Sequence, residues 1–94
     1  MSESTLAILL LNWNGIGETV ACVDSLLKSK TSIRFDIYIL DNGSREDEVG
    51  KLNAKYHGIE NIIILPSPTN LGFTGGNNFL IIEARKRKNY EYLF

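Results

Sequence analysis

The sequence predicts an α/β fold, in which a mostly parallel sheet lies between two layers of helices. Three short apolar runs rich in isoleucine and leucine are each followed closely by turn residues, as is typical of buried parallel strands. Segments with helical spacing of apolar residues separate these runs, so strand and helix alternate along the chain. Because crossovers between parallel strands are right-handed, this alternation predicts a doubly wound, three-layer α/β/α arrangement.

The first strand and the first helix are expected within residues 6–30. The run LAILLLN, which begins at Leu6, is apolar up to its last residue and predicts a buried strand. Lys28 and Lys30 suit the last turn of a helix, where positive charge is favourable. The segment GETVACVDSLLKSK therefore predicts an amphipathic helix, with apolar residues at helical spacing at Val20, Val23, Leu26 and Leu27.

The second strand and helix repeat this pattern. FDIYILD, from Phe35, predicts another buried strand. In SREDEVGKLNAKYHG, Ser44 and Asp47 have the spacing of a capping box, and Gly58 is expected to close the helix.

A third unit follows, with NIIILP from Asn61 as its strand and NNFLIIEARKRK as its helix. NYEYLF then begins a fourth strand. The basic run from Arg85 to Lys88 could bind nucleic acid or a membrane, but its place at a helix end favours a solvated turn that complements the helix dipole. The apolar positions expected on this helix are Phe79, Leu80, Ile82 and Ala84.

Composition limits the classes of function. Ninety-four residues predict one domain spanning 1–94, and 44% hydrophobic with 22% charged residues excludes disorder as the main state. A net charge of -1 argues against nucleic acid or an anionic membrane as partner and favours a small molecule. Cys22 cannot form an internal disulfide, and its valine neighbours predict a buried, unreactive thiol, which fits a cytoplasmic location. No apolar run is long enough to span a membrane, and we expect no export signal.

Polar residues gather where the strands end. In doubly wound sheets, ligands bind outside the carboxyl ends of the strands, and three loops meet there: NWNGIG, DNGS and PSPTNLGFTGG. Glycine permits sharp turns and close approach to a ligand, while asparagine offers both donors and acceptors. One polar cleft is expected to collect the third loop together with Asn12, Asn14, Asp41 and Asn42.

Asp41 is the main candidate for ligand recognition, because an acid at a strand end can accept from a ribose hydroxyl or a base N–H. The alternative is a simple turn residue, since DNGS is strong turn chemistry. Trp13 could stack on a base or plug the end of the sheet. His57 has no metal-ligand spacing around it and is expected at the surface, and no residue has the setting of a catalytic nucleophile.

A dinucleotide-binding fold is the rival hypothesis. Gly15 and Gly17 resemble the start of G-x-G-x-x-G, and Asp41 lies at a suitable distance downstream. However, Val20 stands where the third glycine is needed for close packing of helix and strand. The third loop is not a P-loop either, because no lysine follows its glycines.

The motifs LLNWNG, YILDNGS and NLGFTGGNN, in this order, resemble the amino-terminal part of inverting glycosyltransferases of family 2, and the bacterial rhamnosyltransferase-like branch above all. The resemblance covers Leu6 to Phe94 and implies a GT-A fold, a Rossmann-like fold that is truncated here. It implies that Asn12, Trp13 and Asn14 lie around the base, and that Asp41 accepts from the pyrimidine ring N–H. The nucleotide-binding set would also include Asn42, and the wall beside the nucleotide would be formed by Asn70, Gly72, Gly75 and Asn78.

The resemblance also implies the reaction. A complete enzyme would transfer a sugar from a UDP- or dTDP-sugar to a polysaccharide or lipid-linked glycan in bacterial surface or cell-wall synthesis, in the cytoplasm or at the inner membrane face. Its D-x-D motif, which holds Mg²⁺ or Mn²⁺, and its carboxylate base would follow YEYLF and are missing from this chain. We therefore expect a donor-binding part with no catalytic residue and no metal site, inactive alone. The alternatives are a non-catalytic binding module and a NAD-dependent oxidoreductase fragment.

The implied strand order is 3-2-1-4, which places the first strand inside the sheet. We expect its edge, from Leu6 to Leu11, to be met by the segment from Tyr90 to Phe94 or by another chain, since an uncovered apolar edge promotes self-association.

Overall fold

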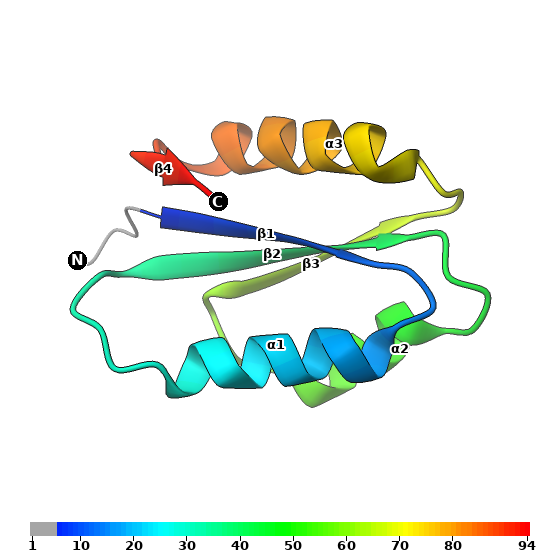
Figure 1. Cartoon of the computed structure of the whole chain (residues 1–94), viewed down its shortest axis with the longest axis horizontal. Helices are drawn as coiled ribbons and strands as arrows, with labels where there is room; N and C mark the ends of the chain where they lie inside the picture. The colour runs from blue at the N-terminus through cyan, green and yellow to red at the C-terminus, as the bar shows by residue number, and fades with distance from the viewer. Residues whose placement is uncertain (1–5) are drawn as a thin grey trace.

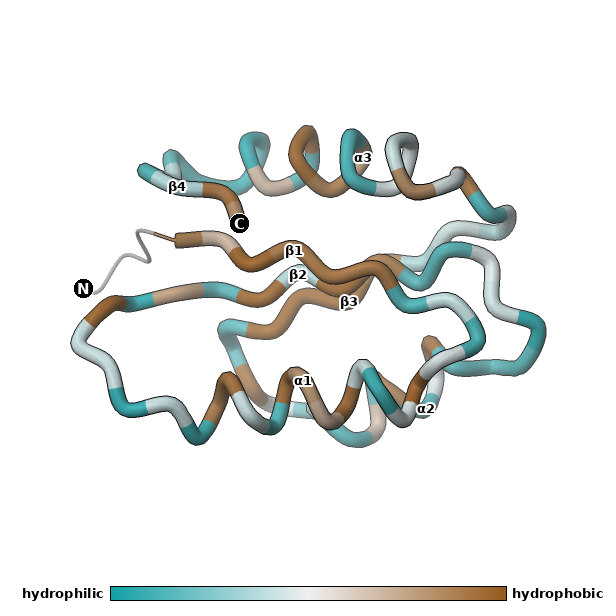
Figure 2. The backbone as a smooth tube through the Cα atoms, in the orientation of Figure 1, coloured by the Kyte–Doolittle hydropathy of each residue, from teal (hydrophilic) through white to brown (hydrophobic). Residues whose placement is uncertain are grey.

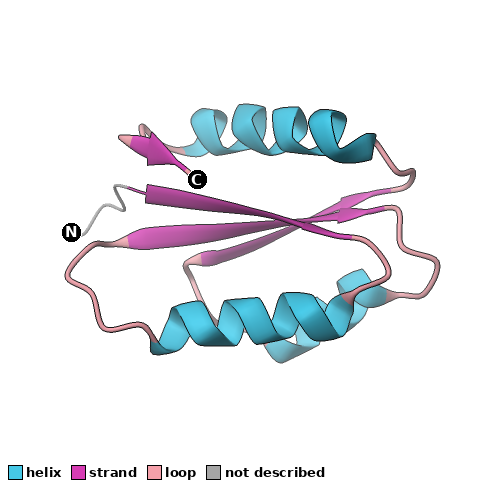
Figure 3. Cartoon of the chain, viewed as in Figure 1, coloured by secondary structure: helices cyan, strands magenta, loops and turns pink. Residues whose placement is uncertain are grey.

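The computed structural model describes residues 6–94, which form a parallel sheet between two layers of helices (Figure 1). The order of strands across the sheet is β3-β2-β1-β4, which confirms the predicted α/β class and the order 3-2-1-4. Helices α1 and α2 cover one face, and α3 covers the other (Figure 3). The elements are β1 Leu6–Asn12, α1 Ile16–Lys28, β2 Phe35–Asn42, α2 Glu48–Lys55, β3 Ile62–Ser67, α3 Gly72–Arg87 and β4 Tyr92–Leu93.

Strand β2 is the centre of the core, and from Asp36 onward all its residues are buried. Because side chains alternate along a strand, its two faces serve two apolar clusters. Ile37 and Ile39 pack toward α1 and α2, and Tyr38 and Leu40 pack toward α3. In Figure 2 the strands are mostly brown, and the helices on either side of them alternate between brown and teal.

The edge of β1 is covered at its beginning. Leu6 pairs with Tyr92 and Ala7 with Leu93 in parallel register. Beyond these pairs, the N–H of Leu9 donates to the carbonyl of Phe94 at 2.8 Å. The segment after α3 therefore meets this edge as predicted, over the first half of β1.

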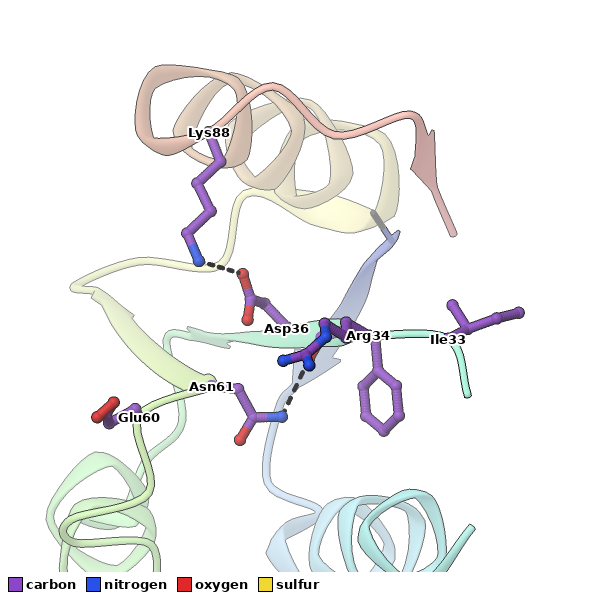
Figure 4. Close-up of a pocket in the computed structure, with 7 residues that line it drawn as sticks. Ile33, Arg34, Asp36, Glu60, Asn61 and Lys88 are labelled. Atoms are coloured by element: carbon purple, nitrogen blue, oxygen red, sulfur yellow. Dashed lines mark hydrogen bonds and ion pairs between the residues drawn. The ribbon is translucent and has the colours of Figure 1, made fainter. Parts of the chain in front are cut away.

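A buried polar network fastens the connection between α3 and β4. The Tyr90 hydroxyl donates to Asp36 Oδ2, and the Tyr38 and Tyr90 hydroxyl oxygens are 2.8 Å apart. Lys88 Nζ lies 3.1 Å from the same Asp36 oxygen. Figure 4 shows Lys88 reaching from the end of α3 toward Asp36. The rest of the basic run forms the last turn of α3 as expected, whereas Lys88, although its side chain is 45% exposed, is paired with a buried acid.

The structure corrects the prediction of where α3 begins. It begins at Gly72, not at Asn77, so most of the glycine-rich stretch forms its first turns. Gly75 and Gly76 are poor helix formers, which favours a loop, but tertiary packing decides otherwise. A Cβ on Gly76 would lie 2.8 Å from Leu11 Cδ2, so the missing side chain lets α3 approach the sheet closely.

Two local predictions are wrong. The N-cap of α2 is Asp47, whose Oδ1 accepts from the N–H of Gly50 at 2.9 Å, while Ser44 is bonded elsewhere. Cys22 is exposed, because the buried positions of α1 are Thr19 and Val23, and the helix turns Cys22 away from the sheet.

Candidate functional site

Three connecting segments meet at the carboxyl ends of β1, β2 and β3, which we call the carboxyl edge, and hydrogen bonds tie them together. Asn14 joins the first two segments, because its N–H donates to Ser44 Oγ at 2.9 Å and its Oδ1 accepts from the N–H of Arg45 at 2.8 Å. It does so with a positive φ of 50°, a conformation that asparagine tolerates better than most residues. The predicted convergence of the loops is thus present in the structure.

The third segment is tied to β2 by Asn42. This side chain, 4% exposed, accepts from the N–H of Leu71 at 2.7 Å and donates to the carbonyl of Gly72 at 3.2 Å. Asn70 supports the same start of α3, since its Oδ1 accepts from the N–H of Gly72 at 2.6 Å. Asn42 and Asn70 therefore fix the position of the α3 amino terminus.

A second cluster lies below the carboxyl edge, on the α1 and α2 side of the sheet. Asn12 is 1% exposed, and its Nδ2 donates at 2.9 Å to both Asp41 Oδ1 and Glu48 Oε1. Its Oδ1 accepts from the Thr19 hydroxyl at 2.6 Å. The Ser44 hydroxyl completes the cluster by donating to Asp41 Oδ1 at 2.6 Å.

The two oxygens of Asp41 differ in their partners. Oδ1 accepts from Asn12 and from the Ser44 hydroxyl, whereas Oδ2 accepts from the Ser44 N–H at a longer distance of 3.3 Å. An ionised carboxylate offers about four lone-pair positions and only accepts hydrogen bonds. Asp41 is 4% exposed, and its Oδ2 keeps unused capacity to accept a hydrogen bond.

The remaining predicted residues lie around these clusters. Trp13 is 54% exposed, so it does not plug the end of the sheet and keeps its ring free for stacking. Gly72 begins α3 with a φ of 77°. Gly75 is half-buried and Asn78 is exposed further along the helix. The structure therefore brings seven of the nine predicted residues to the carboxyl edge or to the cluster directly below it, and places Gly75 and Asn78 along α3.

Two members of the buried cluster were missed from the sequence, and one was assigned another role. Thr19 and Glu48 lie in α1 and α2, where the apolar pattern indicates other residues as the buried ones. The sequence predicts Ser44 as a helix cap and not as a member of this cluster. Thr19 is a polar residue on the face of α1 that carries Val23, and this position is the feature of the sequence that could have indicated its role. Nothing in the local sequence indicates that Glu48 contacts Asn12, 36 residues away.

Two cavities lie away from this site. One, of about 400 Å³, is at the opposite edge of the sheet, where Asp36 is already bonded to Lys88 and Tyr90 (Figure 4). The other, of about 480 Å³, lies between the end of α2 and β3, and His57, exposed as expected, lines it. Neither cavity includes a predicted site residue.

The residues of the site do not fit a divalent metal. Within residues 6–94, no group of three or more His, Cys, Asp or Glu side chains is placed to hold one. Asp41 and Glu48 lie close together, but Asn12 and Ser44 occupy the space between them with donors. A metal needs lone pairs directed at one open position. No step is therefore assigned to a metal in this part of the chain.

A comparison with family models matches residues 8–93 to the family described as Glycosyl transferase family 2. A comparison with curated proteins finds no match. The matched residues include every residue named above in the two clusters. In the described part of the chain, no helix has the length and apolar character needed to cross a membrane.

Proposed function

Because the chain belongs to glycosyltransferase family 2, we propose that its carboxyl edge binds the nucleoside diphosphate of a sugar donor, with Asp41 accepting from a ring N–H of the base. The observation that carries the proposal is the asymmetry of the Asp41 carboxylate, whose Oδ1 is saturated by internal donors while Oδ2 has one weak contact. Uracil, thymine and guanine carry a ring N–H that such an oxygen accepts. Cytosine presents a lone pair at the equivalent position and is repelled.

Trp13 supports the proposal from a second direction. Its ring is exposed on the segment that follows Asn12, which bonds Asp41 directly. We expect an exposed ring on this segment to stack on the base, and base–aromatic stacking contributes about 1–3 kcal/mol. Asn70 and Gly72, held by the bonds described above, form the adjoining wall in this proposal.

The role of this chain in the reaction is binding and orientation. We propose that the complete enzyme transfers the sugar to a polysaccharide or lipid-linked acceptor with inversion, by direct displacement at the anomeric carbon. The divalent metal and the carboxylate base of that reaction would come from outside residues 6–94, since the acids described here do not fit a metal. The rhamnosyltransferase-like branch, the cytoplasmic location and the inactivity of this chain alone belong to the same proposal.

The test is a nitrogen-15 amide titration with UDP, dTDP and GDP, with CDP and NAD as discriminating ligands. The chain has one tryptophan, so the indole signal reports Trp13 without ambiguity. We expect a saturable shift of this signal with at least one base that carries a ring N–H, and none with CDP or NAD. Asp41→Asn should weaken that binding at least about tenfold, because an amide cannot accept as an anion does.

Glu46→Gln is the matched control, because Glu46 is an exposed acid on the same connecting segment. Its substitution removes one negative charge close to the site without touching the buried cluster. A dispersed spectrum that no nucleotide changes would contradict the proposal. So would equal responses to UDP and CDP, or unchanged binding in Asp41→Asn.

A further inference from the structure

Glu48 is a buried acid that has no direct role in the proposed binding of the nucleotide. It is the first residue of α2 and is 7% exposed. Its Oε1 lies 2.9 Å from Asn12 Nδ2 and 3.3 Å from Ser44 Oγ. A buried charge is costly unless it is hydrogen-bonded, and the amino terminus of a helix favours negative charge. The position of Glu48 meets both conditions.

Glu48 fixes the orientation of Asn12. The amide has two N–H hydrogens, and these are used by two carboxylates, Asp41 and Glu48, each at 2.9 Å. Because an ionised carboxylate only accepts, the nitrogen must face both acids and the oxygen must face the Thr19 hydroxyl. With one acid removed, half of this constraint on the amide is lost.

The consequence for Asp41 is geometric. Asn12 and Ser44 both bond Asp41 Oδ1, and both also lie within hydrogen-bond distance of Glu48. The Ser44 hydroxyl has one hydrogen and donates it to Asp41 Oδ1 at 2.6 Å, so its longer contact with Glu48 adds no second bond. Glu48 thus holds one of the two donors of Asp41 Oδ1, the Asn12 amide. The other oxygen, Oδ2, has the longer contact of 3.3 Å with the Ser44 N–H.

We propose that Glu48 is a positioning residue for base recognition, which holds the Asn12 amide on Asp41 Oδ1 so that Oδ2 is left to accept from the ring N–H of the base. This inference rests on the proposed function. The competing interpretation is a purely structural one, in which Glu48 only stabilises the start of α2. The two interpretations differ in whether the effect of Glu48 on binding passes through Asp41.

The experiment is a double-mutant cycle for UDP affinity, measured by calorimetry on the whole chain. Glu48→Ala should weaken UDP binding about tenfold, and Glu48→Gln less, since its carbonyl still accepts from Asn12. In the Asp41→Asn background, the same Glu48 substitutions should change affinity less than about twofold, because the oriented acceptor is already gone. Glu46→Ala is the matched control and should leave affinity unchanged.

A readout of the unliganded protein accompanies the cycle. The two side-chain amide protons of Asn12 should have distinct, protected NMR signals in the wild type and should lose this protection in Glu48→Ala. If Glu48→Ala does not fold, Glu48→Gln carries the same cycle and the same NMR measurement.

The outcomes separate the two proposals. Equal losses in both backgrounds, or a Glu48 variant that binds UDP as the wild type does, would overturn this inference alone. An Asn12 amide that is unchanged in both Glu48 variants would do the same. Absence of any nucleotide binding by the wild type would overturn the proposed function and this inference with it.

Discussion

Gly43 permits a close backbone contact between two segments of the site. It follows β2 directly, with a φ of 80°. A Cβ at this position would lie 2.6 Å from both the carbonyl carbon of Thr69 and the backbone nitrogen of Asn70. Since these are backbone atoms, they cannot move aside as the end of a flexible side chain would. We therefore expect Gly43→Ala to be strongly destabilising.

The magnitude can be built from two contributions. A side chain in the left-handed region costs about 1–2 kcal/mol, and overpacking against a rigid neighbour costs about 1–3 kcal/mol. Restriction of the unfolded chain by alanine returns about 0.4–1 kcal/mol. The expected net loss is about 3 kcal/mol, a substantial part of the roughly 5–15 kcal/mol that stabilises a typical domain.

Gly58→Ala is the matched control. Gly58 has nearly the same φ, 83°, but its Cβ would meet no atom within 4 Å. It should lose only the conformational contribution, about 1 kcal/mol. Urea unfolding measured by circular dichroism gives both values, and the difference of about 2 kcal/mol isolates the close approach. If Gly43→Ala is no more destabilising than Gly58→Ala, the contact between these two segments is not as tight as described.

Three further predictions concern other parts of the molecule. Asn42→Ala removes the two bonds that hold the start of α3 and should cost about 1–3 kcal/mol in urea unfolding, whereas an unchanged midpoint would show that these bonds do not matter. Burial, with hydrogen bonds adding to it, raises the pKa of Tyr90, so the free energy of unfolding should fall as pH rises above about 10, where the unfolded chain ionises. Tyr90→Phe should reduce this loss of stability above pH 10, whereas Tyr92→Phe, a control at an exposed site, should not. Burial also raises the pKa of Tyr56 to about 12, so the free energy of unfolding of both variants should still decrease with pH. Cys22 should react with a thiol reagent in native buffer, and a reaction that requires denaturant would contradict its exposure.

The sequence predicts the arrangement of strands and helices well because the buried strands carry nearly uninterrupted apolar runs. Ile37, Ile39 and Leu40 leave no other interpretation for β2, and the packing follows from the alternation of its faces. The predicted start of α3, at Asn77, is wrong for a physical reason. Glycine has a low helix propensity, and only the packing of Gly76 against Leu11 shows why it is needed inside a helix.

For the site, the sequence predicts which segments meet but not which side chains bond other parts of the protein and which remain available to a ligand. Asn12, Asn14 and Asn42 all reach the carboxyl edge, yet their amides bond other parts of the protein. Which asparagines bind ligand and which hold loops depends on contacts between residues some 30 positions apart. The contact between Glu48 and Asn12 could not be predicted from the sequence for the same reason, because 36 positions separate the two residues.

The short strand β4 also affects how the chain folds. Its partner β1 is the first described element of the chain, and α1, β2, α2, β3 and α3 all lie between them. Closing so long a loop for so few backbone pairs is slow, and contacts of this kind form late. On the ribosome, β1 can pair with β2 long before residues 92–93 are synthesised. The outer side of β1 therefore remains open until residues 92–93 have been synthesised, and an open strand edge exposes the nascent chain to aggregation.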